Sequence, residues 1–442
     1  MPYGPTVKTF VALLLFLVFC EDRTANYESH IGAPMGWVYD YLLTPTVIKL
    51  RLFDILMIVA LLATGFRRDG KGRHIPLMKS SVLLVLATTL VWFVFGLVRG
   101  GQFRFASWQT YLILSMVLVT FAVASVFRTA ADYEYLGKWL LASAMYRAVM
   151  CWISYFTWAR LFVGESGMYL TSHADTITWV TAILILLINA LDRRSSAISF
   201  RNFVLIIVIV GAIQWNSRRI AWVSLGMGLV IFYFLLPSGT AIKRRINRVA
   251  IGFIPVVLLY VVIGWGRQER IFLPLRSLSS VSTKEDGSTL ARNAENLGLI
   301  ATANYVNPAT GTGWGNAYVY LTMKYDISGF ELWRYVPHDS ILGLLAFTGF
   351  LGFTGFWMAF PTAVFLNARV ARLARDPRIR SVATVGAAQM VVSANQFFGD
   401  MGLFMPQSMY VIAVSYAMAL RLPQQAGVWA APKAGARAKQ TT

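Results

Sequence analysis

One histidine and the residue after it are the first candidates for chemistry in this chain. His338, one of four histidines, is followed directly by Asp339 at the start of an apolar run. A neutral imidazole can take a proton from a hydroxyl group, and an adjacent acid can orient the ring or act as the base itself. His338 and Asp339 are therefore the candidate catalytic residues. A structural role for His338 is the alternative, and His173 is a secondary candidate.

Arginines supply the second set of candidates. Arg218 and Arg219 follow Ser217 in a short turn between two apolar runs. The planar guanidinium group suits phosphate, although arginines in such a turn can also bind headgroups or extend towards the membrane surface. Arg147 lies near the middle of another apolar run, where a charge needs a partner or a cavity. It would either pair with an acid such as Asp54 or meet an anion.

A glycine-rich segment follows a predicted helix. Gly311, Gly313 and Gly315 alternate after Asn307-Pro308, which ends the helical pattern, and alternating glycines allow close backbone approach. Either the segment is a tight turn packed on the other helices or it faces a ligand. The preceding helix is predicted over 288–306 from apolar residues at helical spacing, namely Leu290, Ala294, Leu297, Ala301 and Tyr305.

Composition indicates which elements position these residues. The chain has 442 residues, 57% apolar and 14% charged, whereas soluble proteins have roughly 45–50% and 25%. This excludes a soluble enzyme, a disordered chain and a disulfide scaffold. An all-α polytopic membrane protein of about twelve transmembrane helices is predicted. The apolar runs are 8–20, 47–66, 81–98, 108–127, 135–158, 176–191, 202–216, 219–236, 249–265, 341–366, 380–398 and 404–421.

The 40 Lys and Arg residues predict the orientation. Most fall on one side when both termini are placed in the cytoplasm, as the positive-inside rule requires. Residues 1–265 then hold spans one to nine, with 8–20 read as an uncleaved span. Residues 266–340 form one large helical loop outside, 341–421 hold spans ten to twelve, and 422–442 are a disordered cytoplasmic tail. The net charge of +20 thus reflects topology, so we expect no nucleic-acid partner.

Three motifs in this order resemble the bacterial O-antigen ligase and polymerase superfamily. They are Ser217-Arg218 at the start of a span, Arg292 ahead of the glycine-rich segment, and His338 followed by Gly349 and Gly352. The family also has about twelve spans and a large periplasmic loop between spans nine and ten. This chain departs from it in having Asp339 where Asn is frequent, and a second arginine where Ser-Arg-Gly is usual.

The resemblance implies a membrane glycosyltransferase with a GT-C-like fold in the bacterial inner membrane. It would move a glycan from an undecaprenyl-diphosphate donor to a sugar hydroxyl on the periplasmic face, with inversion. The acceptor would be a second lipid-linked glycan in a polymerase, slightly favoured here, or lipid A-core in a ligase. A secondary transporter or a flippase for the lipid-linked glycan is the alternative.

Site roles follow from the same resemblance. Arg218 and Arg292 would clamp the diphosphate, with Arg219 and Arg147 as weaker candidates, and His338 would be the base. Ser217 and the three glycines, Gly311, Gly313 and Gly315, would line the substrate. We expect no cofactor and no metal, because the sequence has no acidic cluster with metal-binding spacing. Outer-face arginines would stabilise the leaving diphosphate instead.

Overall fold

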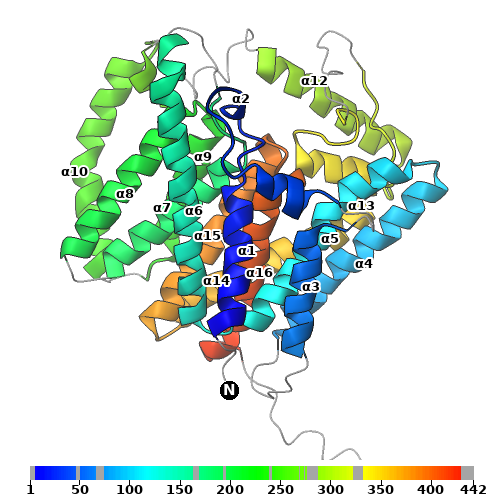
Figure 1. Cartoon of the computed structure of the whole chain (residues 1–442), viewed down its shortest axis with the longest axis horizontal. Helices are drawn as coiled ribbons and strands as arrows, with labels where there is room; N and C mark the ends of the chain where they lie inside the picture. The colour runs from blue at the N-terminus through cyan, green and yellow to red at the C-terminus, as the bar shows by residue number, and fades with distance from the viewer. Residues whose placement is uncertain are drawn as a thin grey trace, which may run out of the picture.

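The computed structural model is all helical, with no strand in the part of the chain that it describes (Figure 1). The first eight predicted membrane runs coincide with helices whose bounds differ from the prediction by a few residues. The ninth coincides with a helix that begins earlier, at Ala241. The described residues are 5–45, 50–65, 74–162, 169–192, 196–237, 241–267, 269–272, 274–275, 287–321 and 332–429.

Most helices are long, and several of them, such as α1 (Pro5–Cys20), α6 (Ala130–Thr157) and α10 (Ala241–Gly264), run up and down the view in Figure 1. Short helical turns connect several of them. The long helices are α1 Pro5–Cys20, α3 Leu52–Gly65, α4 Pro76–Val98, α5 Phe103–Val126, α6 Ala130–Thr157, α7 Asp175–Asp192, α8 Ser196–Trp215, α9 Arg219–Leu235, α10 Ala241–Gly264, α12 Gly287–Ala301, α13 Ser340–Trp357, α14 Ala359–Leu373, α15 Pro377–Gly399 and α16 Pro406–Gln425. The short ones are α2 Glu28–Ile31, η1 Val38–Leu43, η2 Ala159–Phe162, η3 Arg270–Phe272, η5 Thr302–Val306 and η6 Gly402–Phe404.

The predicted tenth run covers α13 and the start of α14, which meet at Met358, and α13 is itself kinked. Inside α13, Gly349 adopts φ +59° and ψ −173°, which interrupts the helical backbone. Phe350 N and Leu351 N then donate to the carbonyls of Pro308 and Ala309, at 2.9 and 3.0 Å. The glycine-rich segment thus takes over backbone hydrogen bonds at the kink. A side chain at Gly349 would collide with Ala309, at 2.4 Å from its backbone carbon.

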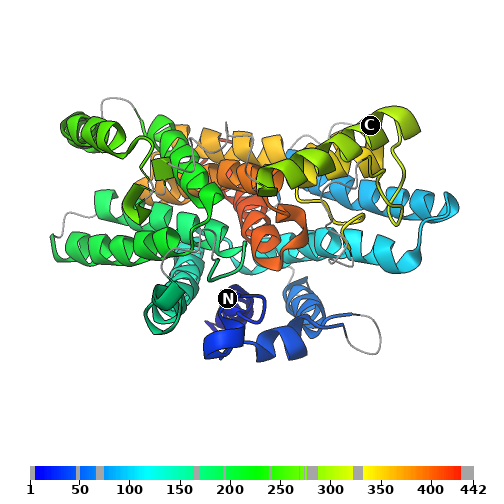
Figure 2. The same ribbon diagram turned by 90° about the horizontal axis from the view of Figure 1, so that it is seen from above.

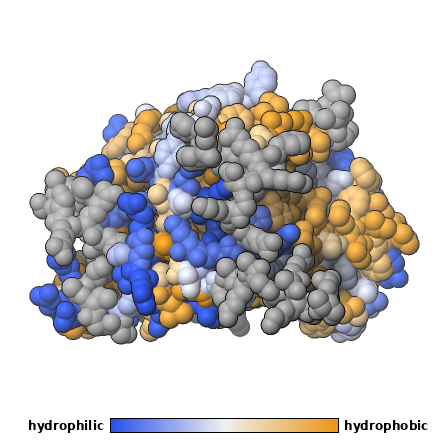
Figure 3. Space-filling view, turned by 90° about the horizontal axis from the view of Figure 1, so that it is seen from below, coloured by the Kyte–Doolittle hydropathy of each residue, from blue (hydrophilic) through white to orange (hydrophobic). Residues whose placement is uncertain are grey.

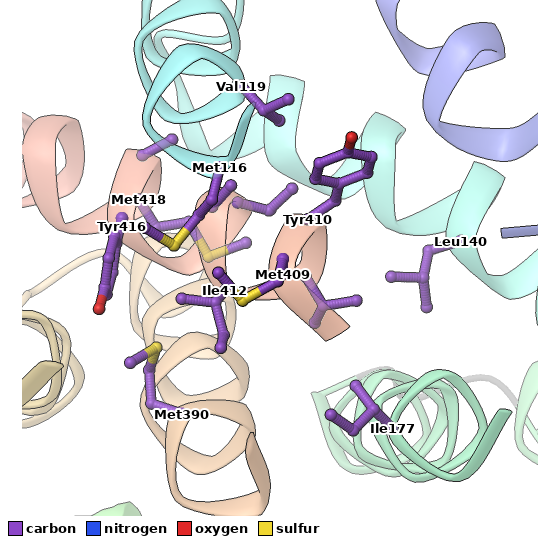
Figure 4. Packing of buried hydrophobic residues seen from close by; sticks show 14 of the residues in the cluster. Met116, Val119, Leu140, Ile177, Met390, Met409, Tyr410, Ile412, Tyr416 and Met418 are labelled. Atoms are coloured by element: carbon purple, nitrogen blue, oxygen red, sulfur yellow. The ribbon is translucent and has the colours of Figure 1, made fainter. Parts of the chain in front are cut away.

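Helix α16 forms the centre of the bundle. Its side chains are buried from Gln407 to Pro423, and it packs against α5, α7, α14 and α15. Figure 4 shows Met409, Ile412 and Met418 of this helix among apolar side chains of the neighbouring helices. Seen from above, α16 lies among the other helices rather than at an edge (Figure 2). Polar residues are also buried along it, and Ser415 donates to Gln389 of α15 at 2.7 Å.

Within the described residues, four helical segments are long and apolar enough to cross a membrane by length and composition. They are Pro76–Val98, Phe103–Val126, Lys243–Gly264 and Ser340–Leu373. Five further apolar helices are shorter, among them α1, α7 and α9. The third long segment, within α10, has none of its most apolar stretch buried in the protein. These segments could therefore span a membrane, and the number of crossings stays a prediction.

One end of the bundle carries several basic residues at helix termini. Lys8 of α1 bonds Asp132 of α6 at 2.5 Å, and Arg378 of α15 pairs with Glu134 at 3.1 Å. Figure 3 views the molecule from below, the side on which α1 begins in Figure 1, and shows hydrophilic and apolar areas side by side. Helices α2 and α12 lie at the opposite end (Figure 1). The predicted tail begins within the end of α16, and residues 430–442 lie outside the described ones.

The helix predicted over 288–306 is confirmed, since α12 continues through η5 to Val306. Its buried face agrees with the predicted one in part, since Ala294 and Ala301 are buried. Leu297 and Tyr305 are 58% and 87% exposed, while Glu295 and Leu299 are buried. The apolar pattern missed Glu295 because this residue is an acid.

Candidate functional site

Arg218 lies at a sharp turn between α8 and α9. Ser217 adopts a left-handed backbone, with φ +55°, and Arg218 is the N-cap residue of α9. Its side chain is 5% exposed and donates through Nη2 to the Thr171 carbonyl at 2.8 Å. Arg219 begins the helix and is exposed. The two neighbouring arginines therefore have different surroundings, and only Arg218 is held inside the site.

Asp400, directly after α15, is the centre of a charged cluster. One of its carboxylate oxygens contacts His173 Nδ1. Arg218 Nη1 lies 4.0 Å from the other oxygen, and Arg292 Nη2 lies 3.8 Å from the first. Arg218 Nη1 also lies 2.7 Å from His173 Nδ1. The structure thus brings the two arginines of the predicted clamp to a single carboxylate.

The pKa values in this cluster reflect burial and charge. Burial alone would raise the pKa of Asp400, but the hydrogen bond from His173 and the charges of His173, Arg218 and Arg292 together lower it. Burial lowers the pKa of His173, and the two arginines lower it further, while Asp400 opposes them. The lowered pKa therefore favours the ionised form of Asp400, and the guanidinium groups of Arg218 and Arg292 supply positive charge next to it.

His338 adjoins this cluster through the backbone. Met401 N, the residue after Asp400, donates to the His338 carbonyl at 2.8 Å. Arg292 and Glu295 lie one turn apart on α12, so one helix contributes to both parts of the site. The side chains of Arg292, His173 and His338 are 41%, 34% and 32% exposed, above a buried Asp400. These residues make up what we call the charged site: His173, Arg218, Arg292, Glu295, His338 and Asp400.

Glu295 is the carboxylate that holds His338. Its Oε2 lies 3.1 Å from His338 Nδ1 and accepts from His338 N, also at 3.1 Å. Tyr318 OH donates to Oε1 at 3.3 Å, which fixes the other side of the carboxylate. If Nδ1 carries the proton towards Glu295, Nε2 is left as the proton acceptor. The pair has the arrangement of an oriented general base.

Asp339 has a different task from the one predicted. Its Oδ1 accepts from Ile341 N at 3.0 Å and Leu342 N at 2.9 Å, which makes it the N-cap of α13. The residue is 3% exposed, and its Oδ2 is buried without a hydrogen-bond partner. Burial raises its pKa to about 6, against the two backbone hydrogen bonds. The geometry therefore does not support Asp339 as a catalytic group or as the residue that orients His338, because its carboxylate is committed to the helix.

Arg147 forms a buried ion pair with an acid, which was one of the two predicted alternatives, and takes no part in the charged site. It is fully buried, with Nε and Nη2 donating to Asp175 at 2.8 and 2.6 Å and Nη1 donating to Tyr27 OH at 2.6 Å. The suggested partner Asp54 was wrong, because that residue contacts Tyr111 OH and accepts from Ser115. The guanidinium group of Arg147 thus binds a carboxylate of the protein itself.

The glycine-rich segment packs on the bundle instead of lining a substrate. Gly311, Gly313 and Gly315 have φ of +65°, +81° and +87° and are buried. A Cβ at Gly313 would lie 2.3 Å from Gly96 Cα of α4. Gly313 N donates to the carbonyl of Phe347 at 2.8 Å. The packing interpretation is the right one, and the substrate-lining role of these glycines is corrected. Ser217 shapes the turn before Arg218, and its Oγ contacts the Trp215 carbonyl.

Sequence reasoning missed Glu295 and Asp400 and ranked His173 second. Glu295 precedes His338 by a long stretch of chain, and Asp400 lies between two apolar helices. One signal was available, because acids are scarce here, with 20 in 442 residues. An acid on the same helix as Arg292, or beside a helix end predicted on the outer side, could have been singled out on that ground.

Among the described residues, no group of three or more His, Cys, Asp and Glu side chains is placed to hold a metal ion. Neither a protein-family model nor a curated protein matches the chain. The functional conclusion therefore depends on the chemistry of the charged site.

Proposed function

We propose that the protein is a membrane glycosyltransferase that moves a glycan from a lipid diphosphate to a sugar hydroxyl. The observation that supports this most is the approach of Arg218 and Arg292 to one carboxylate, with His338 joined to the residue beside it. The donor would be an undecaprenyl-diphosphate-linked glycan, as the resemblance implies. A surface-polysaccharide polymerase or O-antigen ligase would use such a site.

The two arginines would stabilise the leaving group. Breaking the glycosidic bond leaves its electron pair on the diphosphate oxygen, so negative charge grows there. Arg218 is buried and fixed by the Thr171 carbonyl, whereas Arg292 is partly exposed on α12. One arginine would thus be preorganised, and the other would be accessible to the incoming donor. This division lets the scheme proceed without a metal ion.

His338 would act as the base. Its Nε2 would take the proton of the acceptor hydroxyl while the oxygen attacks the anomeric carbon from the face opposite the diphosphate. That direct displacement inverts the anomeric centre. Glu295 would hold the imidazole in one tautomer and stabilise its protonated form. We regard Glu295 as a positioning residue, since it acts through His338.

The setting we propose is the bacterial inner membrane, with about twelve spans and both termini in the cytoplasm. The segment 266–340 would lie on the periplasmic side and carry Arg292 and Glu295. The acceptor there would be a second lipid-linked glycan or lipid A-core. Membrane lipids would surround the exposed apolar helices such as α10.

Purified protein tests the proposal directly. Wild type, His338→Ala, Arg218→Ala and Arg292→Ala would be incubated with extracted lipid-linked glycan and acceptor, and the product would be measured on gels. We expect each variant to lose at least about 10²-fold in turnover. Arg99→Ala, which removes an exposed arginine at the end of α4 outside the charged site, is the matched control and should keep wild-type turnover. Wild-type rates from the His338 and Arg218 variants would overturn the assignment.

Chelation tests the metal-free scheme separately. Activity should persist in EDTA, and a loss that magnesium restores would contradict the role given to the arginines. The transporter alternative relied mainly on Arg147, which the ion pair with Asp175 now accounts for. Substrate uptake by vesicles without glycan transfer would decide for that class. A flippase would move lipid-linked glycan between leaflets without forming a new glycosidic bond.

A further inference from the structure

A cleft with both polar and apolar lining lies next to the charged site. Its volume is about 570 Å³. One wall is the segment 23–30, which includes α2, and the other contains Trp158 and Tyr169. The Arg218 guanidinium lies over the Tyr169 ring, 4.4 Å from its centre. One aromatic side chain therefore separates the cleft from the arginine proposed to hold the diphosphate.

The chemistry of this cleft suits a neutral polyhydroxyl ligand. Short polar side chains such as Thr24, Asn26 and Ser29 line it together with Tyr169 and Trp158, and His30 stacks on one face of Trp158 with 3.6 Å between the ring centres. Hydroxyl and amide groups pair with sugar hydroxyls, and aromatic faces pack on the C–H groups of a sugar ring. The charges nearly cancel, since Glu28 and Arg23 both line the cleft and Arg23 also pairs with Asp40. A second phosphate site is therefore not indicated.

Hydrogen bonds hold the two walls of the cleft in place. Tyr27 N donates to the Leu170 carbonyl at 3.1 Å, and Asn26 Nδ2 donates to the Tyr169 carbonyl at 2.8 Å. Tyr27 OH is in turn fixed by the buried Arg147. The two walls are thus tied to each other and to α6. A preformed cleft loses less conformational freedom when a ligand binds.

We propose that this cleft binds the glycan of the lipid-linked donor, at sugars remote from the bond that breaks. The inference rests on the proposed function. It assigns the cleft to the donor because Tyr169 of the cleft contacts Arg218, whereas His338, which would meet the acceptor, does not line the cleft and joins the charged site through Met401. Tyr169 would then contact both the diphosphate-binding arginine and the glycan.

Filling the cleft tests the proposal by kinetics. Ser29→Trp places an indole in the cleft, and Tyr41→Trp places one on the same part of the chain, outside the cleft at a position 73% exposed. We expect Ser29→Trp to raise the KM for a donor with a complete repeat unit at least tenfold. The KM for a donor with one sugar, and the KM for the acceptor, should not change. Tyr41→Trp should match wild type throughout.

Trp158→Leu and Trp158→Phe form a second pair of variants. Only Trp158→Leu should raise the KM for the donor with a complete repeat unit. A change confined to the acceptor KM, or unchanged kinetics in both Ser29→Trp and Trp158→Leu, would overturn the proposal. Either result leaves glycan transfer by the wild type intact, so the two proposals fail separately.

A binding measurement covers the case in which the wild type transfers no glycan. Oligosaccharides released by mild acid from extracted lipid-linked donors would be titrated calorimetrically into the full-length protein. We expect wild type and Tyr41→Trp to bind them at least tenfold more tightly than Ser29→Trp. Equal affinity in all three proteins, or no heat from any of them, would overturn the assignment of the cleft.

Discussion

Removing the buried charge of Arg147 should destabilise the protein strongly. Arg147→Met replaces the guanidinium with an apolar side chain of similar length. Arg147 is fully buried, and the side chain of Asp175 is 4% exposed. The substitution therefore leaves a carboxylate inside the bundle without its cation, and Tyr27 OH loses its donor.

The size of the effect follows from these contacts. Breaking one partner of a buried ion pair costs about 3–5 kcal/mol, because the remaining charge stays desolvated. The loss of the Tyr27 contact adds about 1–3 kcal/mol if no other group replaces it. We expect the free energy of unfolding to fall by at least about 3 kcal/mol. Asp175→Asn should cost a similar amount, since it leaves the guanidinium unpaired.

The double variant Arg147→Met/Asp175→Asn separates the interaction energy of the ion pair from the other contributions of the two side chains to stability. It carries neither charge, so most of the lost stability should return. The coupling energy from the four proteins should be about 2 kcal/mol or more. Unfolding would be followed by intrinsic fluorescence during titration of mixed micelles with SDS. Wild-type stability of Arg147→Met, or a double variant no more stable than either single variant, would refute the reasoning.

Three further outcomes are expected at other positions. Burial raises the pKa of Asp339 to about 6 from an ordinary 3.8, so the folded state loses stability as the pH rises through this range. Asp339→Asn keeps a capping oxygen and should unfold at a higher temperature than wild type at pH 8. That advantage should shrink as the pH falls below 6, and a growing one would contradict the assignment. Glu295→Gln should lower kcat about 10²–10⁴-fold with little change in either KM, and unchanged single-turnover rates would exclude the positioning role. Gly313→Ala, placed against Gly96 with φ +81°, should lower thermal stability more than Gly100→Ala, which has φ +90° and open space; equal effects would show that backbone conformation alone decides.

Much of the fold was predictable, because an apolar segment in a membrane must satisfy its own backbone hydrogen bonds, and the helix does so. The helices from α3 to α9 follow the predicted runs within a few residues. The kink inside α13 was not predictable, because Gly349 has the sequence context of an ordinary residue in an apolar helix, and only the folded chain brings Ala309 against it. The distance between Gly313 and Gly96 is likewise a property of the folded chain.

The site was predictable only in part. Arg218, Arg292 and His338 were recognisable as residues of unusual type on the side predicted to be outside, and the structure places them around one cluster. Their carboxylate partners were not recognisable. Glu295 and Asp400 belong to segments that are far apart in the sequence, and no residue spacing indicates that they come close together in the fold. Asp339 was misread for the same reason, since an acid beside a histidine in sequence also occupies the N-cap position of a helix.

The negative charge of Asp400 opposes the binding of anions at the charged site. Its carboxylate lies 4.0 Å from Arg218 and 3.8 Å from Arg292, so an arriving anion competes with a negative charge that is already present. A single phosphate gains little from such an exchange, whereas a diphosphate offers more charge and can reach both guanidinium groups together. The abundant monophosphate lipids of a bilayer would thus be poor ligands for the site. Because Asp400 would weaken the binding of every anion, a scarce diphosphate lipid could compete with the more numerous monophosphate lipids for the site.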